Sequence, residues 1–132
     1  MYHSILRAVG EGNASFWYNQ SKIDAERKRR VYYTYILCCA DGTYYTGFTT
    51  DPDARTAQHN AGKGAKYTRS RRPVRKVWQA AWTTEHEARS CEWHIKRLTR
   101  REKECLVQCA PETAAYRAVW AKVAARVARV DG

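Results

Sequence analysis

The chain has 132 residues, a length that suits one compact domain and leaves little room for a second. Lys and Arg together number 24 against 13 Asp and Glu, so the formal net charge is +11. This excess attracts polyanions, which makes nucleic acid the first partner to consider and an anionic membrane surface the second. No run approaches the roughly 20 apolar residues of a membrane span, and the N-terminus lacks a signal-peptide pattern, so we expect neither a membrane protein nor a secreted one.

Five cysteines are present, with no Cys-x-x-Cys pair and no histidine at zinc-finger spacing. Cys105 and Cys109 lie one helical turn apart and could be mistaken for half of a metal site, but we expect reduced thiols packed in a helix. Reduced thiols indicate a reducing compartment. We therefore predict a cytoplasmic protein, associated with the nucleoid if it is bacterial.

Residues 1–30 show no sustained hydrophobic period and end in the basic run Arg27-Lys28-Arg29-Arg30. We expect an N-terminal extension that is poorly ordered or loosely docked. Regular structure begins after it. Val31–Cys38 is rich in aromatic and β-branched residues, Ala40-Asp41-Gly42 is a turn signal, and Thr43–Thr49 is the expected return strand. This pattern predicts a β-hairpin.

The register of this hairpin decides where two tyrosines point. A two-residue loop would place Tyr35 and Tyr45 on opposite faces of the sheet. A three-residue loop with Gly42 in the left-handed conformation pairs Leu37 with Tyr45 and Tyr35 with Gly47, which puts both hydroxyls on one face. We predict this second register, in which Gly47 leaves room beside Tyr35.

A helix is expected next, capped by Thr50 or Asp51, with Pro52 at its first position and Gly62 after its end. A loop over 62–76 and a third strand over 74–82 follow. Two capping boxes, Thr84 with Glu87 and Thr99 with Glu102, predict helices over 85–97 and 100–109, and a last helix is expected over 111–130. The order β-β-α-β-α-α-α predicts an α+β domain with a three-stranded sheet flanked by helices.

The last helix carries valines along one side, at positions Val119, Val123, Val127 and Val130. This edge could dock on the domain or form a dimer seam, so a monomer and a weak homodimer through the C-terminal helix both remain open. We expect Tyr116 and Trp120 on the same helix to pack rather than to stack on bases.

Two triplets, Tyr33-Thr34-Tyr35 and Tyr45-Thr46-Gly47, are followed in order by other polar motifs. These are Arg55 and His59, Asn60-x-Gly62-Lys63-Gly64-Ala65-Lys66-Tyr67-Thr68, Arg72-Pro73-Val74, Glu92-x-x-Ile95-Lys96 and Leu98-Thr99-x-x-Glu102-Lys103. The series resembles the GIY-YIG nuclease superfamily over residues 31–108, and above all its small single-domain bacterial members. Tyr33 and Thr46 depart from the name motif, but both tyrosines that bear the chemistry are retained. The resemblance leaves 109–132 as a C-terminal helical extension.

The resemblance implies five catalytic residues, Tyr35, Tyr45, Arg55, His59 and Glu92, with Glu92 as the ligand of Mg²⁺ or Mn²⁺. Phosphodiester hydrolysis needs an activated water and stabilisation of the phosphoryl charge. A guanidinium can grip a phosphate, an imidazole can bond it or assist proton transfer, and a metal ion supplies much of the charge stabilisation. The residues themselves do not say which tyrosine activates the nucleophile.

Each of these residues also has a purely structural interpretation. Glu92 could form a salt bridge to Arg55 or Arg89, because a carboxylate near a buried edge needs a partner or a metal. Arg55 and His59, four positions apart, share a helix face and could be two solvated polar residues. A single strand tyrosine most often packs in a core.

A basic segment separates the predicted first helix from the third strand. We expect the residues Lys63, Lys66, Arg69, Arg71 and Arg72 to follow a nucleic-acid backbone, with solvation of a loop as the alternative. Lys96 lies one turn from Glu92 and could pair with that carboxylate or touch the substrate.

The resemblance implies a metal-dependent endonuclease that hydrolyses phosphodiester bonds. We expect DNA rather than RNA, branched or damaged DNA among the candidates, and low sequence specificity because no separate recognition domain exists. The main alternative is a non-catalytic nucleic-acid-binding module of the same fold. A basic structural protein that uses its last helix to bind a partner is a further alternative.

Overall fold

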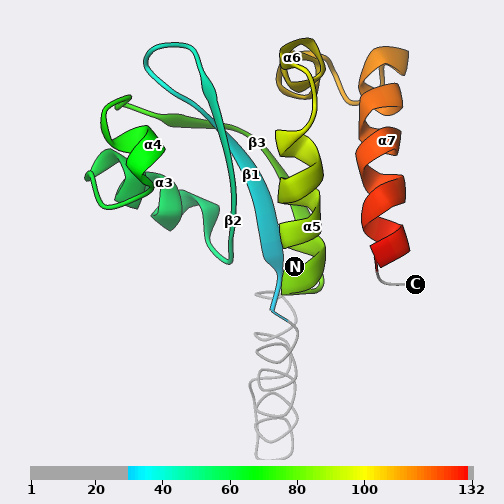
Figure 1. The fold of residues 1–132 in the computed structure, drawn as a ribbon, viewed down its shortest axis with the longest axis horizontal. Coiled ribbons are helices and arrows are strands. Elements are labelled where there is room, and N and C mark those ends of the chain that lie inside the picture. The colour runs from blue at the N-terminus through cyan, green and yellow to red at the C-terminus, as the bar shows by residue number, and fades with distance from the viewer. Residues whose placement is uncertain (1–29, 131–132) are drawn as a thin grey trace, which may run out of the picture. The chain divides into compact units, whose positions relative to one another are not determined.

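The computed structural model describes residues 30–130, with the backbone alone over 128–130. The predicted N-terminal extension, residues 1–30, lies outside the described residues except for Arg30. The described part of the chain forms the elements β1 (Tyr32–Cys38), β2 (Tyr44–Thr49), α3 (Pro52–Asn60), α4 (Lys66–Arg69), β3 (Arg75–Trp82), α5 (Glu85–Lys96), α6 (Arg100–Gln108) and α7 (Ala114–Val130). The predicted α+β class and element order are confirmed (Figure 1).

The three strands form one antiparallel sheet in the order β2-β1-β3, so β1 is central and β2 is an edge strand. Leu37 pairs with Tyr45 and Tyr35 with Gly47, which is the predicted register of the hairpin. Gly42 adopts the predicted left-handed conformation, with a φ of 83°. The tight turn therefore fixes Tyr35 and Tyr45 on the same face.

Alternate residues of β1 face two different helical layers. Ile36 packs with residues of α5, α6 and α7 in the larger core cluster. Tyr35 and Leu37 pack with Val74 and Tyr45 in a second cluster on the other face. Figure 1 shows α3 and α4 on one side of the sheet and α5 to α7 on the other. The sheet thus separates the apolar core from the face that carries the two tyrosines.

Local signals in the sequence set the limits of α3. The side chain of Asp51 caps the helix by accepting the N–H of Ala54, and Pro52 occupies its first turn. Gly62 follows the helix with a φ of 79°, as expected for a residue just after a helix end. The four-residue helix α4 lies inside the stretch expected to be a loop.

Both predicted capping boxes are present. Thr84 and Glu87 bond reciprocally at the start of α5, and Thr99 and Glu102 do so at the start of α6. The helix ends fall within one residue of the predicted positions. Thr34 of β1 donates its hydroxyl to the carbonyl of Ala88 at 2.8 Å, which ties α5 to the centre of the sheet.

The helix α7 docks on the domain through its valine edge. Val123 and Val127 are 1 % exposed and belong to the larger core cluster. Trp120 packs between Trp78 and Trp82, with ring centroids 5.6 and 5.8 Å away. The predicted packing role of the aromatic residues on this helix is confirmed, since Tyr116 also accepts a hydrogen bond from the indole of Trp78 at 2.9 Å.

The five cysteines are free thiols. Burial raises the pKa of Cys91 to about 12, so this thiol is a packing group rather than a nucleophile. Among the described residues, no helix has the length and apolar character needed to cross a membrane.

Candidate active site

Tyr35 and Tyr45 meet on the sheet face beneath α3, with ring centroids 6.5 Å apart. Tyr35 is 1 % exposed, whereas Tyr45 is half-buried. The ring of Tyr35 lies across Gly47, where a Cβ atom would stand 2.6 Å from its hydroxyl oxygen. The absence of a side chain at position 47 therefore lets the phenol extend over the edge strand β2.

His59 joins the two tyrosines from the last turn of α3. Its Nε2 lies 3.1 Å from the Tyr35 hydroxyl, and its ring centroid lies 5.2 Å from that of Tyr45. The side chain is fully buried, so the alternative of a solvated residue on an exposed face is wrong for His59. Burial lowers the pKa of His59, and the nearby positive charge of Arg55 lowers it further. The imidazole is therefore neutral near pH 7.

The surroundings of Nδ1 indicate which nitrogen of His59 carries the proton. Nδ1 lies 2.7 Å from the Thr68 hydroxyl and 3.4 Å from the backbone N–H of Ala65, and an N–H can only donate. Nδ1 is best satisfied as an acceptor, although the Thr68 hydroxyl is also placed to donate to the Ala65 carbonyl at 3.0 Å. In this tautomer Nε2 donates to the Tyr35 oxygen.

Arg55 lies one turn before His59 on α3 and is half-buried. Its guanidinium donates to Gln58 at 2.8 Å and also interacts with the Tyr35 hydroxyl. Burial raises the pKa of Tyr35 to about 12, and the hydrogen bond from Arg55 opposes this rise. The phenol oxygen of this buried tyrosine thus faces two donors, a guanidinium and an imidazole.

Glu92 approaches from the other helical layer, on α5. Its side chain is 18 % exposed, and its carboxylate accepts a 2.6 Å salt bridge from Lys96 one turn later. Of the pairings considered for Glu92, the one with Lys96 is present, while Arg89 pairs with Glu85 at 3.6 Å. The negative charge of Glu92 makes the smallest of the contributions to the shifted pKa of Tyr35. The pocket beside Glu92 is lined by residues of α5 and not by Tyr35 or Tyr45.

The donor set at Glu92 fits a loosely held divalent cation. Within residues 30–130 no cluster of three or more His, Cys, Asp or Glu side chains could enclose a metal ion. Mg²⁺ often keeps several waters and binds through one or two carboxylates together with substrate phosphates. A single half-buried carboxylate beside an open pocket of about 540 Å³ suits such an ion and does not suit a closed structural metal site.

The loop after α3 closes over His59 because it contains glycine at two positions. A Cβ atom on Gly64 would clash with Nδ1 of His59, and one on Gly62 would lie 2.9 Å from the guanidinium of Arg72. Asn60 holds the far end of the loop, since its side-chain amide bonds both the N–H and the carbonyl of Val74 at 2.7 and 2.9 Å. The loop is a fixed wall of the site.

The basic residues of this loop fall into two groups. Lys63, Lys66 and Arg69 expose their side chains to solvent. Arg71 and Arg72 instead bond within the protein: Arg71 pairs with Asp41 at 3.1 Å, and Arg72 donates to the carbonyls of Arg69 and Asn60. The structure thus shows that these two arginines brace the loop.

Three polar residues of the motif series had no assigned role in the sequence. Thr68 is fully buried and bonds His59, Asn60 clamps the loop, and Tyr67 stacks on Tyr45 with centroids 6.0 Å apart. No local signal placed Gly64 and Thr68 together, because Gly64 precedes α4 and Thr68 lies within it. Their contacts with His59 depend on the path of the whole loop, which local patterns do not predict.

Comparison with known proteins places this arrangement in a family. The sequence model of the GIY-YIG catalytic domain matches residues 31–104. A UPF0213 protein of Lacticaseibacillus paracasei is 53 % identical over 79 residues, which cover 60 % of this chain and 89 % of the relative. A UPF0213 protein of Halobacterium salinarum is 49 % identical over 76 residues, covering 58 % of this chain and 99 % of the relative.

A solved structure is also similar to this chain. The solution structure of the UPF0213 protein BH0048 from Bacillus halodurans is 46 % identical and covers 65 % of this chain and 92 % of that one, with a TM-score of 0.41. The match to the family model, over residues 31–104, begins one residue before β1 and includes every residue of the candidate site. The chain therefore belongs to the GIY-YIG catalytic domain family, a family of nucleases.

Proposed function

We propose that the chain is a metal-dependent endonuclease that hydrolyses phosphodiester bonds in DNA. The observation that carries the proposal is the meeting of Tyr35, Tyr45 and His59 on one face of the sheet. The Tyr35 hydroxyl lies 3.1 Å from Nε2 of His59, and Arg55 lies one turn earlier on the same helix. These are the chemical groups that hydrolysis of a phosphodiester requires, contributed by separate segments of the fold.

Tyr35 is the general base in this proposal. Its oxygen faces two donors, the imidazole of His59 and the guanidinium of Arg55. Burial raises the pKa of Tyr35 to about 12 and the hydrogen bond from Arg55 opposes this rise, so the phenolate is a minor form whose share grows with pH. The phenolate takes a proton from the attacking water. Tyr45 is more exposed and carries no such pair of donors, so it is assigned to orient the water or the phosphate.

Arg55 and His59 act on the same oxygen from α3. The guanidinium of Arg55 also stabilises charge that develops on the phosphoryl oxygens, since it can serve two acceptors at once. Neutral His59 holds the Tyr35 phenol in place through its Nε2 proton. Thr68 fixes the ring through Nδ1 and keeps that proton on Nε2.

Glu92 is the proposed ligand for Mg²⁺ or Mn²⁺. A bound divalent ion would supply charge stabilisation at the phosphoryl group and the leaving oxygen. Lys96 neutralises the carboxylate at 2.6 Å when no cation is present. With a divalent ion bound to Glu92, Lys96 would be free to contact a substrate phosphate.

We propose residues 31–108 as the catalytic domain, with 109–132 as a helical extension. The exposed cations Lys63, Lys66 and Arg69 belong to the segment that covers His59, and in this proposal they contact the DNA backbone without reading its sequence. Arg71 and Arg72 support them by bracing the loop and add positive potential. The proposed substrate is branched or damaged DNA, in a cytoplasmic, nucleoid-associated repair process.

The test is cleavage of supercoiled plasmid and of end-labelled branched DNA, with Mn²⁺, with Mg²⁺ and with a chelator. Wild-type protein is compared with Glu92→Gln and with Glu104→Gln, which removes an acid on α6 whose partner is Arg100. We expect metal-dependent nicking that Glu92→Gln abolishes and Glu104→Gln leaves intact.

Cleavage that persists in the chelator, or that survives Glu92→Gln, contradicts the proposal. Binding to DNA without cleavage by any form of the protein identifies a non-catalytic binding module of the same fold instead.

A further inference from the structure

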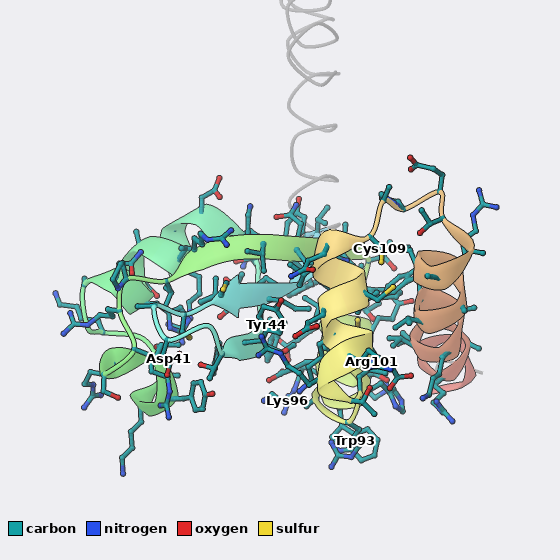
Figure 2. The ribbon with its side chains drawn as sticks, turned by 90° about the horizontal axis from the view of Figure 1, so that it is seen from above. Asp41, Tyr44, Trp93, Lys96, Arg101 and Cys109 are labelled. Atoms are coloured by element: carbon teal, nitrogen blue, oxygen red, sulfur yellow. The ribbon has the colours of Figure 1, made fainter. Side chains whose placement is uncertain are left out.

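Trp93 is the most exposed large apolar side chain among the described residues, with 51 % of its surface accessible. It directly follows Glu92 on α5 and projects from the rim of the domain, on the same side as Lys96 (Figure 2). A single exposed apolar side chain is common on a protein surface, so its location and its neighbours decide whether it has a role. The position of this indole beside the candidate metal ligand therefore calls for an explanation.

The indole lies between two pockets. The first, of about 540 Å³, is lined by residues of α5 that include Glu92, Arg89 and Lys96. The second, of about 340 Å³, lies between α5 and α7 and includes Arg97 and Arg126. Trp93 and His94 line both pockets. The two pockets thus form one continuous surface that extends from Glu92, across Trp93, to the C-terminal helix α7.

The second pocket is strongly cationic. The guanidinium of Arg97 lies over the Trp93 ring, 3.3 Å from its centroid. Arg97 and Arg126 donate only to backbone carbonyls in their own helices, at 3.1 and 3.5 Å, and neither has a carboxylate within ion-pair distance in residues 30–130. Burial lowers the pKa of His94, and the charges of Arg126 and Arg97 lower it further.

An arginine on an exposed aromatic ring occurs a second time next to the site. Tyr67 is 39 % exposed, stacks on Tyr45, and carries the guanidinium of Arg71 at 3.9 Å from its ring centroid. Aromatic rings accompanied by cations are the means by which proteins hold unpaired bases and the phosphates between them. A duplex offers its bases only at the groove edges and cannot use such rings.

From this arrangement, and resting on the proposed nuclease function, we propose that Trp93, Arg97 and Arg126 form a binding site for an unpaired stretch of the DNA substrate. A base stacks on the exposed part of the Trp93 indole, and the neighbouring phosphates contact the two guanidinium groups. The substrate class is accordingly DNA with a single-stranded segment next to the scissile bond. The helix α7, which lies beyond the matched residues 31–104, supplies part of this site.

The test is equilibrium binding by fluorescence anisotropy in a chelator, so that the result does not depend on cleavage. The probes are a labelled DNA single strand, the same strand with abasic residues in place of nucleotides, and the corresponding blunt duplex. The proteins are wild type, Trp93→Ala, Trp93→Phe and the double variant of Arg97 and Arg126 to Gln. Arg117→Gln is the matched control, an exposed arginine of α7 outside both pockets.

We expect Trp93→Ala to weaken binding of the intact strand by roughly fivefold or more, and Trp93→Phe to restore most of it. The abasic strand, which has phosphates and no bases, should bind both Trp93 variants as well as it binds the wild type. The double arginine variant should weaken binding of both strands and reduce the slope of log K against log salt by about 0.7 for each cation removed. Arg117→Gln should match the wild type.

Equal binding of the intact strand by wild type and Trp93→Ala overturns the proposal, as does stronger binding of the blunt duplex than of the strand. An equal loss with the abasic strand also overturns it, because the indole would then not contact a base. If every binding result is as expected but the protein cleaves no DNA in Mn²⁺, the binding site at Trp93 is supported and only the proposed nuclease activity is refuted.

Discussion

The phenol of Tyr35 occupies the space above Gly47, so close that a Cβ at position 47 would lie 2.6 Å from its oxygen. These two residues are paired across the hairpin. Because β2 is the edge strand, the arrangement carries the Tyr35 hydroxyl from the centre of the sheet towards its edge, where α5 contacts β2. The glycine thus explains how the hydroxyl of an almost fully buried tyrosine can extend over the edge strand.

The first prediction concerns this contact. Gly47→Ala should displace the Tyr35 ring and reduce cleavage by at least about 100-fold, the contribution typical of general-base catalysis. Overpacking should also lower the free energy of unfolding by about 1–3 kcal/mol. Cleavage assays and urea unfolding measure the two effects. The double variant Gly47→Ala with Tyr35→Phe should recover only part of this loss, because the oxygen at 2.6 Å is gone while the ring carbon Cζ at 2.8 Å remains.

The second prediction concerns Lys96 as a competitor of the metal ion. Lys96→Met removes the ammonium that holds Glu92 at 2.6 Å. We expect the affinity for Mn²⁺ to rise by up to roughly fivefold, since Lys96 is half-exposed and such an ion pair contributes at most about 1 kcal/mol. Titration calorimetry measures this affinity. Arg89→Met, which removes an arginine that pairs with Glu85 instead, is the control. An unchanged affinity in Lys96→Met would argue against Glu92 as the ligand.

The third prediction is a loss of stability in acid that originates at His59. Burial lowers its pKa in the folded protein, so between the unfolded value of about 6.5 and the folded one the unfolded chain binds more protons. Stability is then fully present above pH 6.5 and falls as the pH decreases below it. Urea unfolding between pH 5 and 8 should show this slope.

His59→Gln should flatten the slope, since the imidazole at position 59 is then absent. Burial also lowers the pKa of His94, so His94→Gln serves to separate the two contributions. If the pH dependence of stability persists in His59→Gln and disappears in His94→Gln, it originates at His94, and the prediction for His59 is wrong.

The fourth prediction concerns α7. Val123 is 1 % exposed in the core, so Val123→Ala should lower the free energy of unfolding by roughly 1–3 kcal/mol. The same change at Val31, which is 44 % exposed, should have little effect. Thermal unfolding at several protein concentrations separates this account from a dimer seam. A midpoint that depends on concentration in the wild type and not in Val123→Ala would favour the seam.

Much of the fold follows from short-range signals in the sequence. The three-residue turn that ends in Gly42 determined the register, because one left-handed residue sets the pairing of every later position in the hairpin. The capping boxes at Thr84 and Thr99 located two helix starts, because they depend only on residues three positions apart. The short helix α4 was not predicted, since its four residues give no hydrophobic period.

The candidate site was predictable in composition and not in geometry. The order of motifs predicted that Tyr35, His59 and Arg55 belong to one site, and in the structure both His59 and Arg55 interact with Tyr35. The full burial of His59 was not foreseen, because it depends on Gly64 allowing the loop to pass over the ring. The exposure of Trp93 was not predicted either, since a tryptophan in a helix is ordinarily buried to a large extent.

The central claim, that Tyr35 acts as the general base, is tested most directly by single-turnover cleavage rates between pH 6 and 9. Wild type, Tyr35→Phe and Tyr45→Phe are compared at saturating Mn²⁺. Because burial holds the pKa of Tyr35 at about 12, the wild-type rate should rise with pH across this whole range. Tyr35→Phe should lose at least about 100-fold in rate together with the pH dependence, and Tyr45→Phe should keep the dependence at a reduced rate. A Tyr35→Phe protein that cleaves with the wild-type rate and the wild-type pH profile would contradict the claim.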